Sequence, residues 1–142
     1  MKYSKSGSKF FLTLSPGEYI NASFENFATK EGIECAWLSG IGAIKDPEIG
    51  FYSLKDKSYQ RKRFIGNFEL TSLQGNISIK QDIPFSHTHI TFSDMKYIVY
   101  GGHLFDAEIL ITGEFIIHKE AIKINRKMDS NIGLHLWCIE SS

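Results

Sequence analysis

Three histidines in a short stretch of the chain could together bind a metal ion. His87 and His89 lie two residues apart in an apolar run, and His103 follows a second such run. Alternate residues of a β-strand point to the same face, so the first two imidazoles should project together, about 7 Å apart along the strand. Three imidazoles around an open position are typical of zinc sites that bind water or a substrate.

A hairpin would bring the third histidine to the other two. The segment Ser93–Lys96 separates the two apolar runs and has the composition of a turn. If the turn centres on Met95, His103 lies directly opposite His87 and diagonally to His89. Both pairs then fall within the cross-strand reach of roughly 5 to 8 Å.

Neighbouring residues could complete this site. In that register Gly101 lies opposite His89 and Gly102 opposite Thr88, and the missing side chains would leave space for water or a small anion. A metal-bound hydroxide could act as a nucleophile if a general base were present. The candidates for a base or a supporting contact are the acids Asp94, Glu69 and Glu114. Each of these acids has an ordinary structural interpretation as well, so no catalytic residue is assigned.

The composition of the chain limits its domain organisation and its possible partners. The chain has 142 residues, of which 42% are hydrophobic, and this suits a single domain over residues 1–142 with a core from roughly 8 to 140. The formal net charge is zero, so there is no overall electrostatic attraction to nucleic acid. The basic runs Lys55–Lys57 and Arg61–Arg63 are interpreted as solvated strand ends. Cys35 and Cys138 lie in apolar runs and are interpreted as small hydrophobic residues.

No apolar stretch approaches the roughly 20 residues that span a bilayer. The first residues are polar and do not resemble a signal peptide. We therefore expect a soluble, cytoplasmic protein with no membrane partner.

The hydrophobic pattern predicts an α+β fold, a mostly antiparallel sheet with one long N-terminal amphipathic helix. Lys9–Leu14 reads as a strand, residues 17–31 as the helix, and Gly32 as its C-terminal cap. Gln74-Gly75 reads as a tight connection between two strands. The other expected strands are residues 34–44, 48–54, 58–65, 68–73, 76–80, 86–92, 97–100, 108–118, 122–126 and 133–139.

Five segments in fixed order resemble the PPC domain (plants and prokaryotes conserved domain, DUF296), in its stand-alone prokaryotic form. They are residues 38–43, 66–75, 87–94, 101–104 and 112–114. The resemblance implies a fold built on an antiparallel sheet and assembly as a homotrimer. Plant members carry AT-hook DNA-binding motifs, and prokaryotic members are often described as predicted DNA-binding proteins. This chain has no Arg-Gly-Arg-Pro hook, so direct DNA binding is not expected.

The resemblance also implies an edge for subunits or partners. Its residues would be Gly66, Phe68, Glu69 and Leu70, with Gly40 and Gly42 permitting close packing between subunits. An ordinary strand whose Phe68 and Leu70 face the core is the alternative.

Part of the histidine pattern is similar to the first metal motif of the cupins. That motif normally has a glycine well before the first histidine, where Gln81 stands here, and no proline follows His103 to form a second motif.

Three functions remain open. The first is an oligomeric binding or regulatory module that holds zinc or another divalent metal and a small ligand or anion. The others are a metal-dependent enzyme and a DNA-associated protein that acts through partner proteins.

Overall fold

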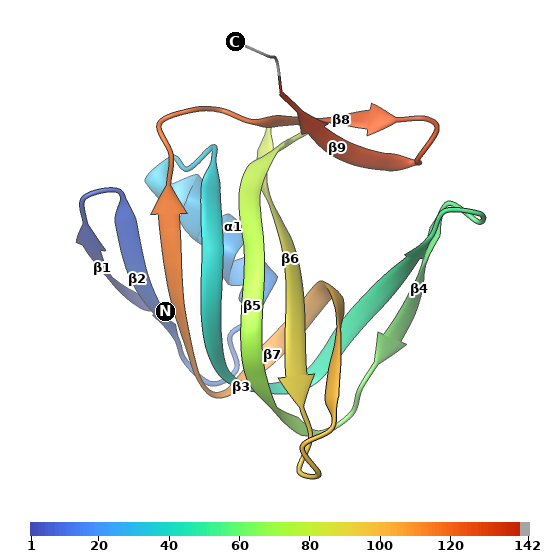
Figure 1. Ribbon diagram of the computed structural model, residues 1–142. Helices are drawn as coiled ribbons and strands as arrows, with labels where there is room; N and C mark the ends of the chain where they lie inside the picture. Colours follow the sequence, from blue (N-terminus) through green and yellow to red (C-terminus); the bar gives the residue numbers. More distant parts are fainter. Residues whose placement is uncertain (140–142) are drawn as a thin grey trace.

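The computed structural model describes residues 1–139, which form a nine-stranded sheet and one helix (Figure 1). All but one of the strand pairings are antiparallel, which confirms the predicted class; the exception is the parallel pair β5–β8. The elements are β1 (Lys2–Ser6), β2 (Lys9–Leu14), α1 (Ile20–Glu31), β3 (Ala36–Ser53), β4 (Ser58–Arg63), β5 (Asn67–Lys80), β6 (Ile83–Ser93), β7 (Val99–Lys119), β8 (Asn125–Asp129) and β9 (Leu134–Cys138).

Four strands form a closed cycle of pairings. β7 pairs with β3, β3 with β5, β5 with β6, and β6 again with β7. β7 can take part twice because it is 21 residues long, and it pairs with β6 only through its first residues, 99–103. Beyond His103, β7 stays with β3 and separates from β6. The cycle is therefore closed at one end of the molecule and split at the other.

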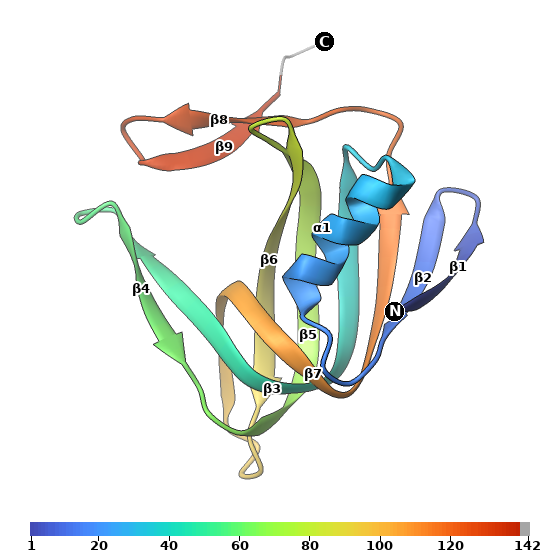
Figure 2. The same cartoon turned by 180° about the vertical axis from the view of Figure 1, so that it is seen from behind.

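The helix covers one face of the sheet (Figure 2). Its apolar side, which includes Ile20, Phe24 and Phe27, is fully buried against the strands. The helix has 12 residues and begins at Ile20, so the prediction of a long helix from residue 17 was wrong. The segment before it turns instead, because Gly17 adopts a left-handed φ of 86°. Gly32 ends the helix with φ 58°, as predicted.

The predicted break at Gln74-Gly75 was also wrong, because β5 runs unbroken from Asn67 to Lys80. Gly75 serves a close approach of β6 rather than a turn. A Cβ at this position would lie 2.5 Å from the carbonyl oxygen of His87. Strand β1 was not predicted, since all five of its residues are exposed and show no alternation of apolar and polar side chains.

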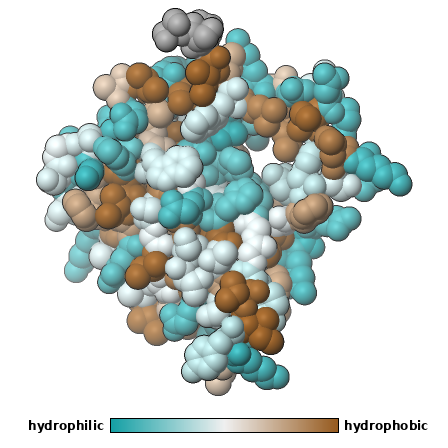
Figure 3. Space-filling model, in the orientation of Figure 1, coloured by the Kyte–Doolittle hydropathy of each residue, from teal (hydrophilic) through white to brown (hydrophobic). Residues whose placement is uncertain are grey.

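Two hairpins frame the split end of the cycle. The β3–β4 hairpin and the β8–β9 hairpin project from the sheet and meet at their tips, where the Tyr52 hydroxyl donates to the Ile132 carbonyl and Lys57 Nζ donates to the Ser130 carbonyl at 2.8 Å. Figure 3 shows an opening between these hairpins. Within residues 1–139, no helix has the length and apolar character needed to cross a membrane.

Candidate metal centre

The three histidines predicted to meet do so at the point where β6 and β7 separate. His87 and His89 lie on β6 and His103 lies on β7, and one ring nitrogen of each lies within 4.8 Å of the others. The ring centroids are 5.2 to 5.5 Å apart. Among the described residues, these are the only three metal-ligating side chains that form such a group.

The hairpin register differs from the prediction by two residues. His89, not His87, lies directly opposite His103, and His87 takes the diagonal position. The turn is longer than expected and spans Asp94–Ile98, with the Asp94 amide bonded to the Ile98 carbonyl at 3.1 Å. Side chains alternate between the two faces of a strand with a period of two residues. A shift of two residues therefore keeps all three imidazoles on one face, and the cluster is preserved.

The two glycines before His103 were expected to leave space beside the imidazoles, but they do not. Gly101 lies opposite Thr91 and Gly102 opposite Ile90. A Cβ at Gly101 would lie 2.8 Å from the Ile90 carbonyl oxygen, and one at Gly102 would lie 3.0 Å from the Gly50 carbonyl oxygen. Both glycines therefore allow close backbone packing on either side of β7.

None of the three candidate acids joins the metal-ligating group. Asp94 caps the turn, where its Oδ1 accepts hydrogen bonds from the backbone amides of Lys96 and Ile98. Glu69 and Glu114 are exposed on β5 and β7. The cluster has no carboxylate ligand within the part of the chain that the structure describes.

The imidazoles are held in the neutral form that binds metals. Burial lowers the pKa of His87 to about 4, with further contributions from the charge of Arg126 and from His89. Burial likewise lowers the pKa of His103 to about 4, with His87 as the next contribution. The pKa of His89 is lowered by the same cause. A metal ion at neutral pH therefore competes with few protons.

Aromatic side chains fix the third histidine. His103 stacks on Tyr59 with ring centroids 4.8 Å apart, and it meets the edge of Phe105 at 5.2 Å. Its Nδ1 atom is buried and has no hydrogen-bond partner among the described residues. A buried nitrogen without a partner is costly unless something binds its lone pair. The donor set and this atom both fit a metal ion.

The cluster has a cationic neighbour that the sequence patterns did not predict. Arg126 on β8 places Nη2 3.3 Å from His87 Nδ1 and 3.0 Å from Asn76 Oδ1. Asn76 lies opposite His87 on β5, so strand pairing could have found it. The parallel pairing of β8 with β5, in which Arg126 lies opposite Lys80, brings Arg126 to the cluster. No local sequence pattern reveals this pairing.

A cavity of about 470 Å³ adjoins the cluster and reaches through the split between β6 and β7 toward the helix. His87, His103 and His135 all line it. The other lining residues are Asn21, Ala22, Glu25, Tyr59, Lys80, Phe85, Ser86, Leu104, Phe105, Asp106, Arg126, Gly133, Leu134 and Leu136.

The residues expected at a subunit edge lie in different environments. Leu70 is only 2% exposed and belongs to the core, and Phe68 packs against Phe92 with ring centroids 5.1 Å apart. These two side chains follow the alternative of an ordinary core-facing strand. Glu69 is exposed beside them, and Gly66 adopts a φ of 123° in the turn before β5.

Gly40 and Gly42 serve contacts inside the chain. A Cβ at Gly40 would collide with the Phe115 ring, and one at Gly42 would collide with the Thr112 carbonyl. The two glycines therefore allow β3 and β7 to pack closely within one chain. A contact between subunits is not needed to explain them.

The fold and the cluster define a small protein with a largely antiparallel sheet, one helix and a candidate tri-histidine centre. The chain belongs to the Plants and Prokaryotes Conserved (PCC) domain family, whose model matches residues 1–120. This confirms the predicted resemblance.

Three solved structures are similar to nearly the whole chain. The PPC protein of Pyrococcus horikoshii is 35% identical, with 99% of this chain and 97% of that one covered and a TM-score of 0.88. A candidate DNA-binding protein of Bacteroides thetaiotaomicron is 30% identical, with 96% of each chain covered and a TM-score of 0.93. A protein of Archaeoglobus fulgidus described as metal-containing is 35% identical, with 98% and 100% covered and a TM-score of 0.86. A search of curated proteins gave no match.

Proposed function

We propose that this protein is a homo-oligomeric binding module that holds a divalent metal, with zinc as the leading candidate, on His87, His89 and His103. The observation that carries the proposal is the convergence of three ring nitrogens within 4.8 Å of one another. Three protein ligands leave a position that can bind water or a small ligand. When bound, zinc would supply a Lewis acid at that position.

Three further observations support this proposal. The low pKa values of His87 and His103 keep both rings neutral at physiological pH. The similar protein of Archaeoglobus fulgidus is described as metal-containing. The cavity beside His87 and His103 offers room for a ligand at the open position.

Elemental analysis of protein purified without a metal-affinity tag tests the proposal. We expect about one zinc per chain in the wild type and at least a roughly 10-fold weaker zinc affinity in His103→Ala, since one of three ligands is lost. His118→Ala is the matched control. His118 is exposed at the far end of β7, where it pairs with Glu120. A wild type without metal, or a His103→Ala protein with wild-type affinity, would refute the metal site.

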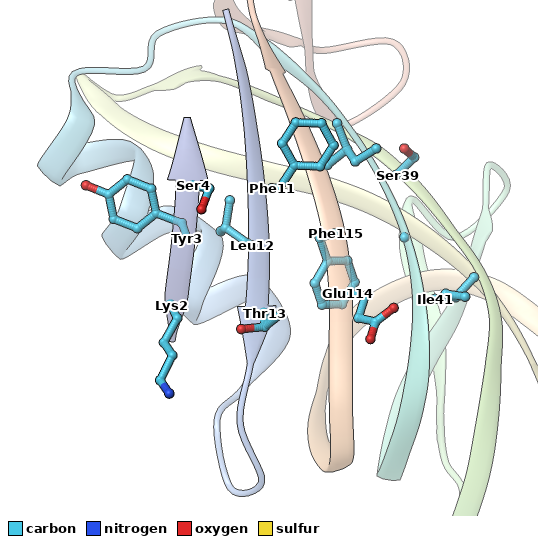
Figure 4. Close-up of a pocket in the computed structure, with 12 residues that line it drawn as sticks. Lys2, Tyr3, Ser4, Phe11, Leu12, Thr13, Ser39, Ile41, Glu114 and Phe115 are labelled. Atoms are coloured by element: carbon cyan, nitrogen blue, oxygen red, sulfur yellow. The ribbon is translucent and has the colours of Figure 1, made fainter. Parts of the chain in front are cut away.

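We also propose that the chain associates with itself, as a trimer, through the face of the sheet opposite the helix. The open face, as we call it, carries the exposed side chains Phe11, Trp37, Ile41, Ile111 and Ile116. Figure 4 shows Phe11, Ile41 and Glu114 among the side chains that line a hollow on this face. The hollow has a volume of about 600 Å³. Several exposed apolar side chains on one face of a sheet favour an interface between proteins.

A metal-dependent enzyme is the second candidate, and the cavity at the cluster is the observation that favours it. For DNA, two similar proteins are described as candidate DNA-binding proteins. The zero net charge of this chain gives no support to direct binding, since phosphate contacts dominate affinity for nucleic acid.

A further inference from the structure

We infer that the ligand taken up beside the metal is a small organic carboxylate with a compact apolar body, and that Arg126 recognises its carboxylate. This inference rests on the proposed metal site and names the class of ligand that the site accepts. Arg126 is a cation in the cavity without an anionic partner among the described residues.

The Arg126 guanidinium is anchored entirely by neutral groups. Nε donates to Ser78 Oγ at 2.7 Å, Nη1 to the His135 carbonyl at 3.0 Å, and Nη2 to Asn76 Oδ1 at 3.0 Å. Within residues 1–139, no carboxylate forms an ion pair with it. A half-buried cation without a counter-charge favours the binding of an anion.

The acids that line the same cavity are already engaged elsewhere. The Asp106 carboxylate accepts hydrogen bonds from the backbone amides of Asn21, Ala22 and Ala107. Glu25 Oε1 accepts from the amide and hydroxyl of Ser86. Both carboxylates are thus held at the helix side of the cavity and do not neutralise Arg126.

Metal binding would release a further donor of Arg126. The guanidinium can only donate, so in its 3.3 Å contact with Nη2 the His87 Nδ1 atom is the acceptor. If the metal binds Nδ1, the lone pair is used. If it binds Nε2, the neutral ring carries its proton on Nδ1. In either case Nδ1 no longer accepts, and one N–H of Nη2 becomes free.

Arg126 then offers two free N–H groups, one on each terminal nitrogen. Its five N–H groups make four contacts in the structure, and the remaining one is on Nη1. Paired donors on a guanidinium match the two oxygens of a carboxylate.

One part of the cavity suits an apolar body. Aromatic and aliphatic side chains line it, namely Tyr59, Phe85, Phe105, Leu134 and Leu136. Its volume of about 470 Å³ lies at the lower end of the range for small-molecule sites. The site therefore favours a compact organic acid over a bare inorganic anion.

Titration of zinc-loaded protein with benzoate, followed by NMR chemical shifts, tests this inference. Acetate lacks the apolar body and benzamide lacks the charge, so both should bind at least roughly 10-fold more weakly than benzoate. Arg126→Gln should weaken benzoate binding by roughly 10- to 100-fold. Arg63→Gln is the matched control, since Arg63 is exposed on β4 and pairs with Glu48. Removal of zinc with EDTA should also weaken benzoate binding.

Zinc content, measured on the same samples, separates the two proposals. Wild-type protein without zinc refutes the metal site. Protein with full zinc that binds benzoate no better than benzamide, or equally well in Arg126→Gln and wild type, overturns the carboxylate inference. If Arg126→Gln cannot retain zinc, the preference of the wild type for benzoate over benzamide decides the question.

Discussion

At the scale of single residues, two influences act on the histidine cluster. His87 and His103 are partly buried, which favours neutral rings, and Arg126 places a positive charge beside His87. Both influences lower the imidazole pKa, so the rings keep their lone pairs at neutral pH. A metal is a stronger competitor for these lone pairs than a proton is under such conditions.

The stability of the metal-free protein should therefore depend on pH. His87 and His103 have a pKa of about 4 in the folded protein and about 6.5 when unfolded. The unfolded chain binds more protons between these values, so the free energy of unfolding falls as the pH is lowered from 6.5 toward 4. Urea denaturation of EDTA-treated protein at several pH values measures this.

Substitution isolates the contribution of one ring. In His87→Asn, the slope of unfolding free energy against pH should decrease by up to the equivalent of one proton relative to the wild type. Identical slopes for the two proteins would contradict the prediction. Carboxylates that also titrate in this range affect both proteins alike.

At the scale of elements, the split between β6 and β7 creates the site, and α1 holds the split in place. Asn21, in the first turn of the helix, is 8% exposed. Its Nδ2 donates to the carbonyls of Leu104 and Phe105, each at 3.1 Å, and its Oδ1 accepts from the Thr88 hydroxyl at 2.7 Å. One side chain thus ties both strands together next to the histidines that they carry.

Asn21→Ala should loosen this arrangement. Loss of buried hydrogen bonds leaves two carbonyls and one hydroxyl unsatisfied, so we expect the free energy of unfolding to fall by about 1–3 kcal/mol. Zinc affinity should fall as well, because His87 and His103 are no longer fixed relative to each other. Chemical denaturation and a zinc titration measure the two effects.

Asn67→Ala provides the comparison, because Asn67 is exposed at the start of β5. We expect it to change stability by less than about 0.5 kcal/mol. An Asn21→Ala protein as stable as Asn67→Ala, with unchanged zinc affinity, would show that the helix does not position the site.

At the scale of the whole molecule, the open face sets the expected assembly. The helix covers the opposite side of the sheet, so apolar side chains on β2, β3 and β7 remain exposed in the isolated chain. Figure 3 views the molecule from this side. The proposed interface is therefore broad and largely made of strand side chains.

Light scattering tests the proposed assembly. The wild type should have three times the chain mass of 16.2 kDa, and Ile41→Glu should shift the protein toward the monomer because it buries a charge beside Glu114. Ile65→Glu is the control, since Ile65 is 77% exposed in the turn between β4 and β5, away from the open face. A wild-type mass of 16.2 kDa would refute the trimer.

Local patterns in the sequence predicted those features that depend on near neighbours. The largely apolar run Lys9–Leu14 predicted β2, Gly32 predicted the end of α1, and the His-x-His spacing placed two imidazoles on one face. Sequence motifs in fixed order also predicted the family. The prediction of a tight connection at Gly75 failed, because only the contact of Gly75 with β6 distinguishes a turn from a close approach.

The spacing of the three histidines was enough to place them on one face of a strand pair, because side-chain alternation survives a register shift of two residues. Which histidines face each other depended on the folded structure, since the length of the Asp94–Ile98 turn depends on its own hydrogen bonds. Only the tertiary structure brought Arg126 to His87, across nearly forty residues of chain, through a parallel strand pairing that leaves no local signal. The three histidines of the candidate site were therefore predictable from their spacing, whereas the position of the charge proposed to select a ligand came from the fold.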